Sequence, residues 1–134
     1  LLTKLDALDE KVSAVEARSP EVVQAYREKL EAKVHERLED SQSDDNRIAA
    51  EVVIYSDKIC NDEETVRLHS HIRGMKKILT EKEGIGRKLD FMAQEMNREA
   101  NTILSKSNDI EISDIAIDLK TEIEKIREQI QNIE

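Results

Sequence analysis

The sequence predicts an all-α protein, and three observations carry that prediction. Apolar residues recur at spacings of three and four along most of the chain, as they do on one face of a helix. Charged residues make up 38% of the chain and aromatic residues only 2%, which is typical of solvated helices around a modest core. Three Gly and one Pro are too few to punctuate the short strands of a β-sandwich. We expect a helical hairpin or coiled-coil arm followed by a four-helix antiparallel bundle-like domain.

The N-terminal part is expected to form the arm. Apolar residues spaced by three and four from Leu5 to Val15 predict a helix that ends near Arg18. Residues 19–21 read Ser-Pro-Glu and predict a fresh helix start, because Ser is a frequent N-cap and Pro suits the first helical position. We expect this second helix to continue to about Asp40 and to form a hairpin or coiled coil with the first.

The polar run at residues 41–46 is the best candidate for a domain boundary. It reads Ser-Gln-Ser-Asp-Asp-Asn, a composition typical of a loop. We therefore assign the arm to residues 1–42 and the helical domain to residues 43–134.

Four helices are expected in that domain. An apolar stripe from Ile48 to Ile59 predicts the first, and Asn61 or Asp62 can cap the second. The Gly-Ile-Gly triplet at 84–86 breaks the helical pattern and turns the chain into the third.

The last helix carries the most regular apolar stripe. Asp109 or Ser113 can cap its start, and Ile and Leu then alternate at spacings of three and four from Ile112 to Ile133. We interpret the stripe as the core of a bundle, with the seam of a homo-oligomer as the alternative.

Charge is distributed unevenly along the chain. The net charge of -9 argues against a protein that coats nucleic acid with its whole surface. One segment is nevertheless strongly basic, with seven basic residues against two acidic ones: Arg67, Arg73, Lys76, Lys77, Lys82, Arg87 and Lys88 against Glu81 and Glu83.

Cysteine content and hydropathy predict a cytoplasmic protein with no membrane partner. Cys60 is the single cysteine, which excludes an internal disulfide framework and fits a reducing compartment. No apolar run approaches the ~20 residues that span a bilayer. Because the chain starts at Leu1 in a helical pattern, we expect a fragment or a processed product.

A histidine near the core edge is the first candidate for chemistry. His71 follows Glu64 and Arg67 on the same flank of one predicted helix, and a histidine beside a carboxylate can act as a general base or a metal ligand. The alternative is a structural histidine satisfied by Glu64. His69 points nearly the opposite way, so the two histidines cannot clamp one ion.

The helix over residues 86–107 supplies two further candidates. Glu95 and Glu99 lie one turn apart and could share a divalent cation with a third ligand, although most such pairs are solvated. A polar flank offers amides and a guanidinium for phosphate or base edges, or else an internal polar network: Asp90, Gln94, Asn97, Arg98 and Asn101. The sequence lacks Walker, CxxC, GxSxG and HExxH motifs, which leaves metal-assisted or acid–base phosphodiester chemistry open.

Three segments carry a resemblance to a known family. Residues 63–72 (EETVRLHSHI), 86–107 (GRKLDFMAQEMNREANTILSKS) and 127–134 (REQIQNIE) resemble the C-terminal domain of the bacterial YicC/YloC family of endoribonucleases, also called stress-induced proteins. The resemblance is dense from Glu51 onward, and residues 1–50 match only as a variable helical connector. The chain departs from the family pattern at Cys60 and at residues 74–76.

The resemblance implies RNA cleavage that depends on Mn²⁺ or Mg²⁺, a ring-like homo-oligomer such as a hexamer, and an N-terminal domain missing from this chain. We expect no specificity for DNA. From the spacing and the resemblance together, we expect catalytic roles for Glu64, His71, Asp90 and Arg98, and metal binding by Glu95 and Glu99. The residues expected to hold RNA are Arg67, Arg73, Lys76, Lys77, Arg87, Lys88, Gln94, Asn97, Asn101 and Lys106.

Two other functions stay open at this stage. The chain could be an oligomerisation and RNA-docking module whose catalytic groups lie in the missing domain, so its own enzymatic activity is undecided. It could also be a helical protein–protein interaction domain that uses the isoleucine stripe.

Overall fold

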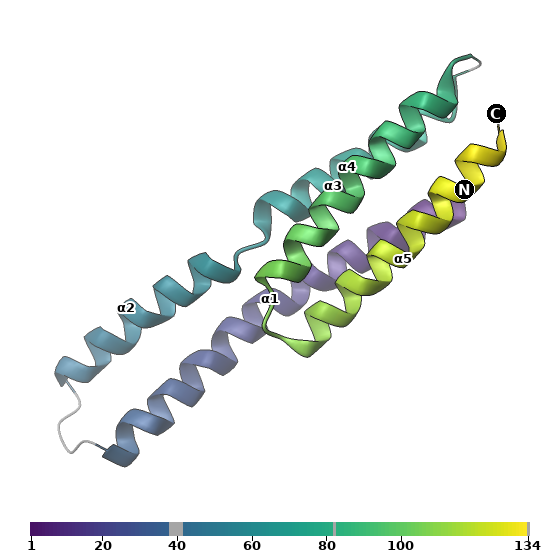
Figure 1. Cartoon of the computed structure of the whole chain (residues 1–134). Helices are drawn as coiled ribbons and strands as arrows, with labels where there is room; N and C mark the ends of the chain where they lie inside the picture. Colours follow the sequence, from purple (N-terminus) through teal and green to yellow (C-terminus); the bar gives the residue numbers. More distant parts are fainter. Residues whose placement is uncertain (38–41, 82, 134) are drawn as a thin grey trace.

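The computed structural model describes residues 1–37, 42–81 and 83–133, and within these ranges the chain forms five helices and no strand. The all-α prediction is therefore confirmed. Figure 1 shows an elongated molecule with a helical bundle at one end and a two-helix arm at the other. The helices are α1 (Leu2–Arg37), α2 (Gln42–Ile59), α3 (Asp62–Ile78), α4 (Ile85–Lys106) and α5 (Ile110–Ile133).

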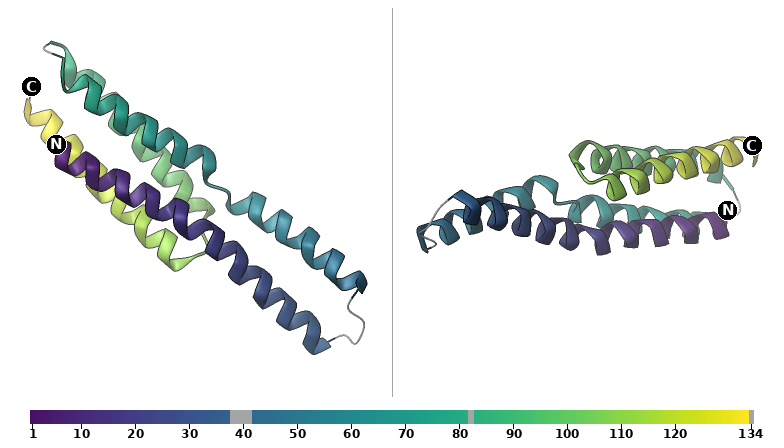
Figure 2. Two further views of the ribbon diagram at one scale, coloured as in Figure 1. Left: turned by 180° about the vertical axis from the view of Figure 1, so that it is seen from behind. Right: turned by 90° about the horizontal axis from the view of Figure 1, so that it is seen from below.

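The bundle is built from α3, α4, α5 and the first half of α1. Helix α1 contacts α3 and α5, and α4 contacts the same two helices, so the four close a ring around one core. Figure 2 shows that the start of α1 and the end of α5 lie at the same end of this bundle, the end away from the arm. Every helix contributes side chains that are almost completely buried, among them Leu5, Leu8, Leu68, Ile72, Leu89, Met96, Ile103, Leu119, Ile123 and Ile126.

The arm is made by the second half of α1 and by α2, which run antiparallel (Figures 1 and 2). Ile48 and Val52 of α2 are 4% and 8% exposed, and Tyr55 of α2 stacks on Tyr26 of α1. A helical arm was predicted from two helices within residues 1–40. The observed arm instead pairs the second half of α1 with α2.

The predicted break at residues 19–21 is wrong, because α1 runs through it as one helix with Pro20 inside. The Ser19 hydroxyl donates to the Val15 carbonyl at 2.9 Å and caps no new helix. The apolar stripe explains the continuity. Its spacing of three and four passes through Ser19 to Val22, so one unbroken helix buries both Val15 and Val22 in the same core.

The predicted loop at residues 41–46 is also wrong in its described part, since α2 begins at Gln42. Ser41 and the predicted helix end at Asp40 lie outside the described residues. The bundle consequently takes its fourth helix from the first half of α1, and α2 belongs to the arm. The boundary between residues 42 and 43 stays a prediction.

Both turns around α4 follow local chemistry. Gly84 precedes α4 with a φ of 65°, a left-handed conformation that favours glycine, which confirms the predicted break. Asp109 caps α5, because its carboxylate accepts from the Ile112 N–H at 3.1 Å. Asn61 holds the N-cap position of α3, although its side chain makes no capping bond.

The isoleucine stripe of α5 is the bundle core. Its members from Ile112 to Ile130 are at most 3% exposed apart from the half-buried Ile115, and Ile133 lies beyond the described side chains. The alternatives that placed an oligomer seam or a protein partner on this stripe are therefore wrong, because the stripe is buried and α1 and α4 pack against α5. In the described part of the chain no helix has the length and apolar character to cross a membrane.

Candidate functional site on the α3 and α4 face

A cluster of four charged side chains joins α3 to α4. Glu64 of α3 and Glu99 of α4 are buried, with side chains 5% and 8% exposed. The Arg67 Nε donates to a Glu99 carboxylate oxygen at 2.9 Å. The Lys106 Nζ donates to Glu64 Oε1 at 2.8 Å and to the Cys60 carbonyl at 3.1 Å. We call these four residues, Glu64, Arg67, Glu99 and Lys106, the α3–α4 charge cluster.

The cluster balances two buried acids with two cations. A carboxylate taken out of water is costly unless a cation and hydrogen bonds compensate it. The hydrogen bond to Glu99 raises the pKa of Arg67 above its ordinary value despite partial burial of the guanidinium. Pairing across the helices therefore holds one oxygen of each acid in place against a cation.

Two buried oxygens beside the cluster have no hydrogen-bond partner among the described residues. They are Glu64 Oε2 and Asn61 Oδ1, both at the start of α3. An acceptor left unsatisfied in this way costs about 1–3 kcal/mol. Both oxygens are buried away from solvent, so their cost falls on the stability of this end of the cluster.

His71 does not pair with Glu64, contrary to one alternative from the sequence, because Glu64 pairs with Lys106 instead. His71 is half-buried, one turn beyond Arg67 along α3. Glu95 is likewise half-buried, one turn before Glu99 along α4. Because the two helices are antiparallel and Arg67 meets Glu99, His71 and Glu95 lie at the same level of the α3–α4 face.

Gly74 continues that register, since a Cβ atom at this position would lie 2.6 Å from the Met92 Cε. Residues 74–76, where the sequence departs from the family pattern, thus begin at a point where α3 and α4 approach closely.

The predicted metal ligands do not form a ready site. One oxygen of Glu99 accepts from Arg67, and Glu95 has only a 3.9 Å contact with Arg98. Across the described residues no three His, Cys, Asp or Glu side chains come together in a way that could hold a metal ion. The described side chains therefore offer no ready-made site of three protein ligands, and the need for Mn²⁺ or Mg²⁺ stays a prediction.

The polar flank predicted on α4 divides into two parts. Asp90 accepts from Arg127 of α5 at 3.2 Å and from Gln94 of its own helix at 2.9 Å. The structure therefore does not bring Asp90 together with the α3–α4 charge cluster. Arg98 and Asn101 are exposed, as is Gln94, and Asn97 is half-buried.

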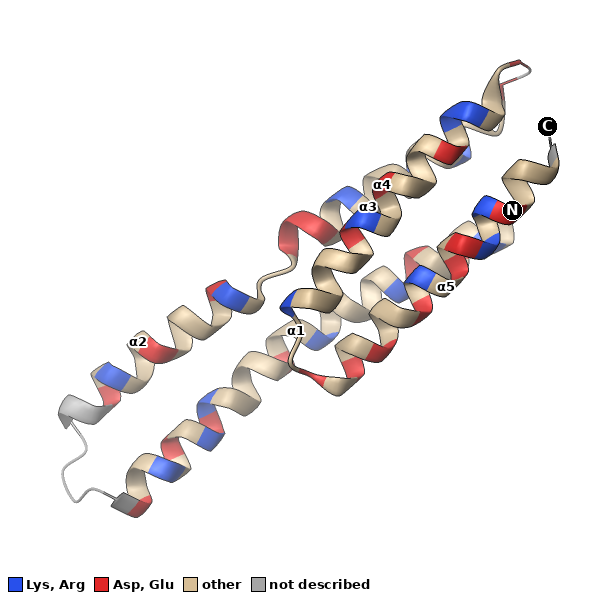
Figure 3. Ribbon diagram, in the orientation of Figure 1, with Lys and Arg blue, Asp and Glu red and all other residues tan. Residues whose placement is uncertain are grey.

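The basic residues of the predicted RNA surface also differ in their availability. Lys76 turns to α1 and pairs with Asp6, and Lys88 pairs with Glu81 at 2.9 Å. Arg73, Lys77 and Arg87 are exposed, and among the described residues they have no acidic partner. Lys82 lies outside the described residues. Figure 3 shows basic and acidic positions interspersed along α4, and an acidic start of α3.

Sequence reasoning missed the role of His69. Its ring nitrogens contact Asp9 and Glu16 of α1, so it ties α3 to α1. Burial alone would lower the pKa of His69, but the hydrogen bonds to the two carboxylates outweigh it and raise the pKa above 6.5. The partners lie at least 53 positions away in the sequence, and no local pattern signals them.

Comparisons with known proteins agree on one family. A family model described as the C-terminal part of YicC-like endoribonucleases matches residues 15–134. A Clostridioides difficile protein named "Probable endoribonuclease YicC" is 51% identical over 132 residues, covering 98% of this chain and 45% of that protein. A Haemophilus influenzae protein of the same name is 41% identical over 133 residues, with the same two shares. The chain thus spans less than half the length of these relatives.

Proposed function

Because this chain belongs to the YicC-like endoribonuclease family through its C-terminal domain, we propose that it takes part in RNA cleavage and that the face formed by α3 and α4 contacts the RNA. The observation that carries this proposal is the α3–α4 charge cluster. It pairs two buried acids with two cations on the face that also carries the exposed Arg98 and the half-buried His71.

The RNA backbone would lie against the exposed cations of this face. Arg73, Lys77 and Arg87 have no acidic partner in the described part of the chain, so their charge is available for phosphate. The exposed amides of Gln94 and Asn101 can add hydrogen bonds to bases or sugars. Lys76 and Lys88, being paired, would contribute less than the sequence predicts.

His71 is the best placed proton acceptor. An imidazole can take the proton from an attacking hydroxyl near neutral pH, and His71 is only half-buried and level with Glu95. Arg98 is exposed and could compensate the charge that develops on the phosphate. Glu64 and Glu99 would act by fixing Lys106 and Arg67 rather than by moving protons.

The test is cleavage of a labelled structured RNA by this chain with and without EDTA. We expect His71→Ala to lower the cleavage rate by about 100-fold or more, as loss of a general base does. The matched control is His35→Ala, because His35 is exposed on the arm. Equal rates for the two variants would overturn the role of His71, and rates unchanged by EDTA would overturn the predicted need for Mn²⁺ or Mg²⁺.

A docking module is the second candidate function. It is favoured by the lack of three convergent metal ligands in the described residues and by the ion pairs that occupy Glu64 and Glu99. RNA binding without cleavage by the unmodified chain would support this candidate over the first.

A further inference from the structure

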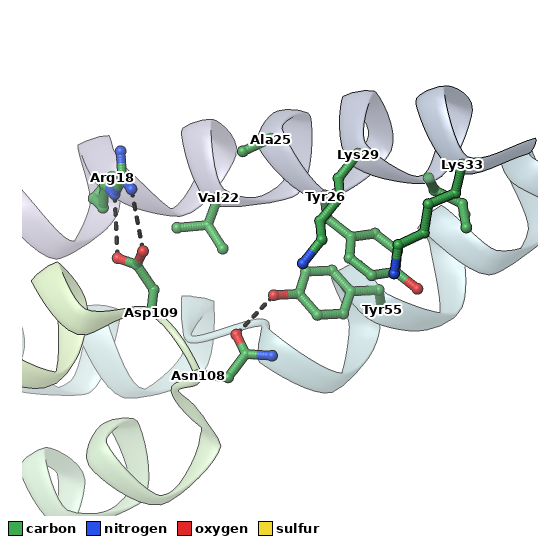
Figure 4. Close-up of a pocket in the computed structure, with 10 residues that line it drawn as sticks. Arg18, Val22, Ala25, Tyr26, Lys29, Lys33, Tyr55, Asn108 and Asp109 are labelled. Carbon is green, nitrogen blue, oxygen red and sulfur yellow. Dashed lines mark hydrogen bonds and ion pairs between the residues drawn. The ribbon is translucent and has the colours of Figure 1, made fainter. Parts of the chain in front are cut away.

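A separate pocket lies where the arm joins the bundle. It encloses about 440 Å³ between α1, α2 and the connection from α4 to α5 (Figure 4). That volume falls within the range of small-molecule sites. None of its lining residues belongs to the α3–α4 charge cluster.

The two tyrosines of the chain meet in this pocket. Tyr26 of α1 and Tyr55 of α2 stack with ring centroids 3.9 Å apart and planes 10° from parallel. Each ring is only half-buried, so the pair presents aromatic surface to the pocket. A chain with so few aromatic residues has placed two of its three at one point, where they can contact a planar ring.

The wall on α1 carries uncompensated positive charge. Lys29 and Lys33 are exposed and reach along the tyrosine rings (Figure 4). Their neighbour Arg27 pairs with Glu31 at 3.1 Å, whereas Lys29 and Lys33 have no acidic partner in the described part of the chain. The pocket therefore offers two ammonium groups to an anion beside an aromatic pair.

The opposite wall is held rigidly. The Tyr55 hydroxyl donates to Asn108 Oδ1 at 2.7 Å, which leaves the amide N–H groups of Asn108 as donors. Arg18 donates to both carboxylate oxygens of Asp109, at 3.1 and 3.2 Å. These two hydrogen bonds from Arg18 fix the connection between α4 and α5, and they lower the pKa of Asp109.

We propose that this pocket binds one nucleotide of a single-stranded RNA. The base would lie against the tyrosine pair, the phosphate would be held by Lys29 and Lys33, and the Asn108 amide would donate to the base or sugar. The choice of RNA over a free nucleotide rests on the proposed function. The chemistry is otherwise the same for both, because each is an aromatic ring joined to a phosphate.

The α3–α4 charge cluster and the tyrosine pocket are built on neighbouring segments of the chain, which favours one RNA strand for both. Lys106 of the charge cluster bonds to the Cys60 carbonyl, at the joint between α2 and α3. Tyr55 precedes that joint by little more than one turn, and Asn108 follows Lys106 by two residues. A strand leaving the Lys106 end of the α3–α4 face therefore meets segments that also build the tyrosine pocket.

Tyrosine fluorescence offers a direct test, because the chain has no Trp and both tyrosines lie in this pocket. We would titrate the chain with UMP and with hexauridylate while recording tyrosine emission. We expect saturable quenching by both, and tighter binding of the hexamer if the pocket serves a strand. Equal affinity for the two probes would overturn the strand part of the proposal.

Charge reversal supplies the matched comparison. The variant Lys29→Glu/Lys33→Glu should weaken quenching by ~10-fold or more, because it replaces both phosphate contacts. The control Lys120→Glu/Lys125→Glu makes the same charge change on α5 and should weaken it by less than ~3-fold. All four lysines are outside the buried core, so both variants keep the packing intact.

The outcomes separate this inference from the proposed function. Anisotropy of a labelled RNA reports binding anywhere on the chain. RNA binding with unchanged tyrosine emission would overturn the pocket and leave the α3–α4 face standing. Quenching by UMP without any RNA binding would overturn the proposed function and support a free-nucleotide site. Equal losses in the two lysine variants would overturn the pocket.

Discussion

At the scale of single residues, the molecule is organised by pairs that cross between helices. Glu64 and Lys106 are 42 positions apart, and Arg67 and Glu99 are 32 apart. Each pair neutralises a buried acid, so removing the cation should cost more than losing a surface ion pair. The side chains that fix the α3–α4 face thereby contribute to the stability of the fold.

We predict that Lys106→Met lowers the free energy of unfolding by about 2 kcal/mol, because the buried Glu64 keeps only its 3.9 Å contact with Arg67. The loss should fall short of the ~3–5 kcal/mol of a fully buried pair, since Lys106 is 35% exposed. Urea denaturation measures it. Adding Glu64→Gln to this variant should restore most of the loss by removing the uncompensated charge.

Lys125→Met is the control for that prediction. Lys125 pairs with Glu122 at 3.3 Å on the surface, and its loss should cost less than about 0.5 kcal/mol. Equal costs for the two lysines would show that the pair between α3 and α4 does not stabilise the bundle.

A second prediction concerns pH. The pKa of His69 is raised above its unfolded value of 6.5, so the charged form favours the folded state. This stabilisation is fully present below pH 6.5 and is lost as the pH rises through the folded pKa. The urea midpoint of the unmodified chain should fall over that window.

His69→Gln should remove this dependence, because the amide cannot gain charge between Asp9 and Glu16. His35→Gln, an exposed substitution on α1, should leave it in place. If the His69→Gln chain kept the full pH slope, another group would have to be its source.

At the scale of helices, the length of α1 is the feature that most changes the architecture. A helix of 36 residues reaches from the bundle into the arm and couples the tyrosine pocket to the core. Pro20 lies inside it and cannot donate a hydrogen bond to the carbonyl one turn earlier. Packing on both sides of Pro20 outweighs this local loss.

We predict that Pro20→Ala raises the free energy of unfolding by about 1 kcal/mol. The substitution restores a helical hydrogen bond, and the gain exceeds the greater freedom of the unfolded chain. Pro20→Gly should gain less, because Gly has a weaker helix propensity. If Pro20 instead began a separate helix, as the sequence suggests, Ala would stabilise nothing, and urea denaturation would show that.

The helices themselves could be predicted from the sequence because burial requires apolar residues at spacings of three and four. The residues at which each helix begins and ends were harder to predict. Ser19 and Pro20 fit a helix start as well as a helix interior, and only the core contacts of Val15 and Val22 decide between them. The polar residues after Gln42 resemble a loop, yet they begin α2.

The candidate site shows the same limit. The sequence pointed to Glu99 as a metal ligand and to Lys106 as an RNA contact, and both side chains bond to α3. It could not assign their partners, because spacing along one helix carries no information about the register of the next. For the same reason the sequence suggested His71, two turns along the same helix, as the partner of Glu64 rather than Lys106.

At the scale of the whole molecule, an acidic chain exposes basic residues on α3 and α4. The net charge is -9, yet Arg73, Lys77 and Arg87 are exposed without acidic partners in the described part of the chain. Under the proposed function, RNA would be repelled by most of the surface and attracted by these exposed cations, which orients the encounter. The expected homo-oligomer stays a prediction, and light scattering would measure its mass.

The final prediction follows from this uneven charge. Arg73→Glu/Lys77→Glu should weaken binding of single-stranded RNA and reduce its dependence on salt. Losing two phosphate contacts should lower the slope of log affinity against log salt by about 1.4. The control Lys120→Glu/Lys125→Glu makes the same change in net charge on α5 and should leave the slope nearly unchanged. If both variants reduced the slope equally, RNA would be responding to the total charge of the chain rather than to the α3–α4 face.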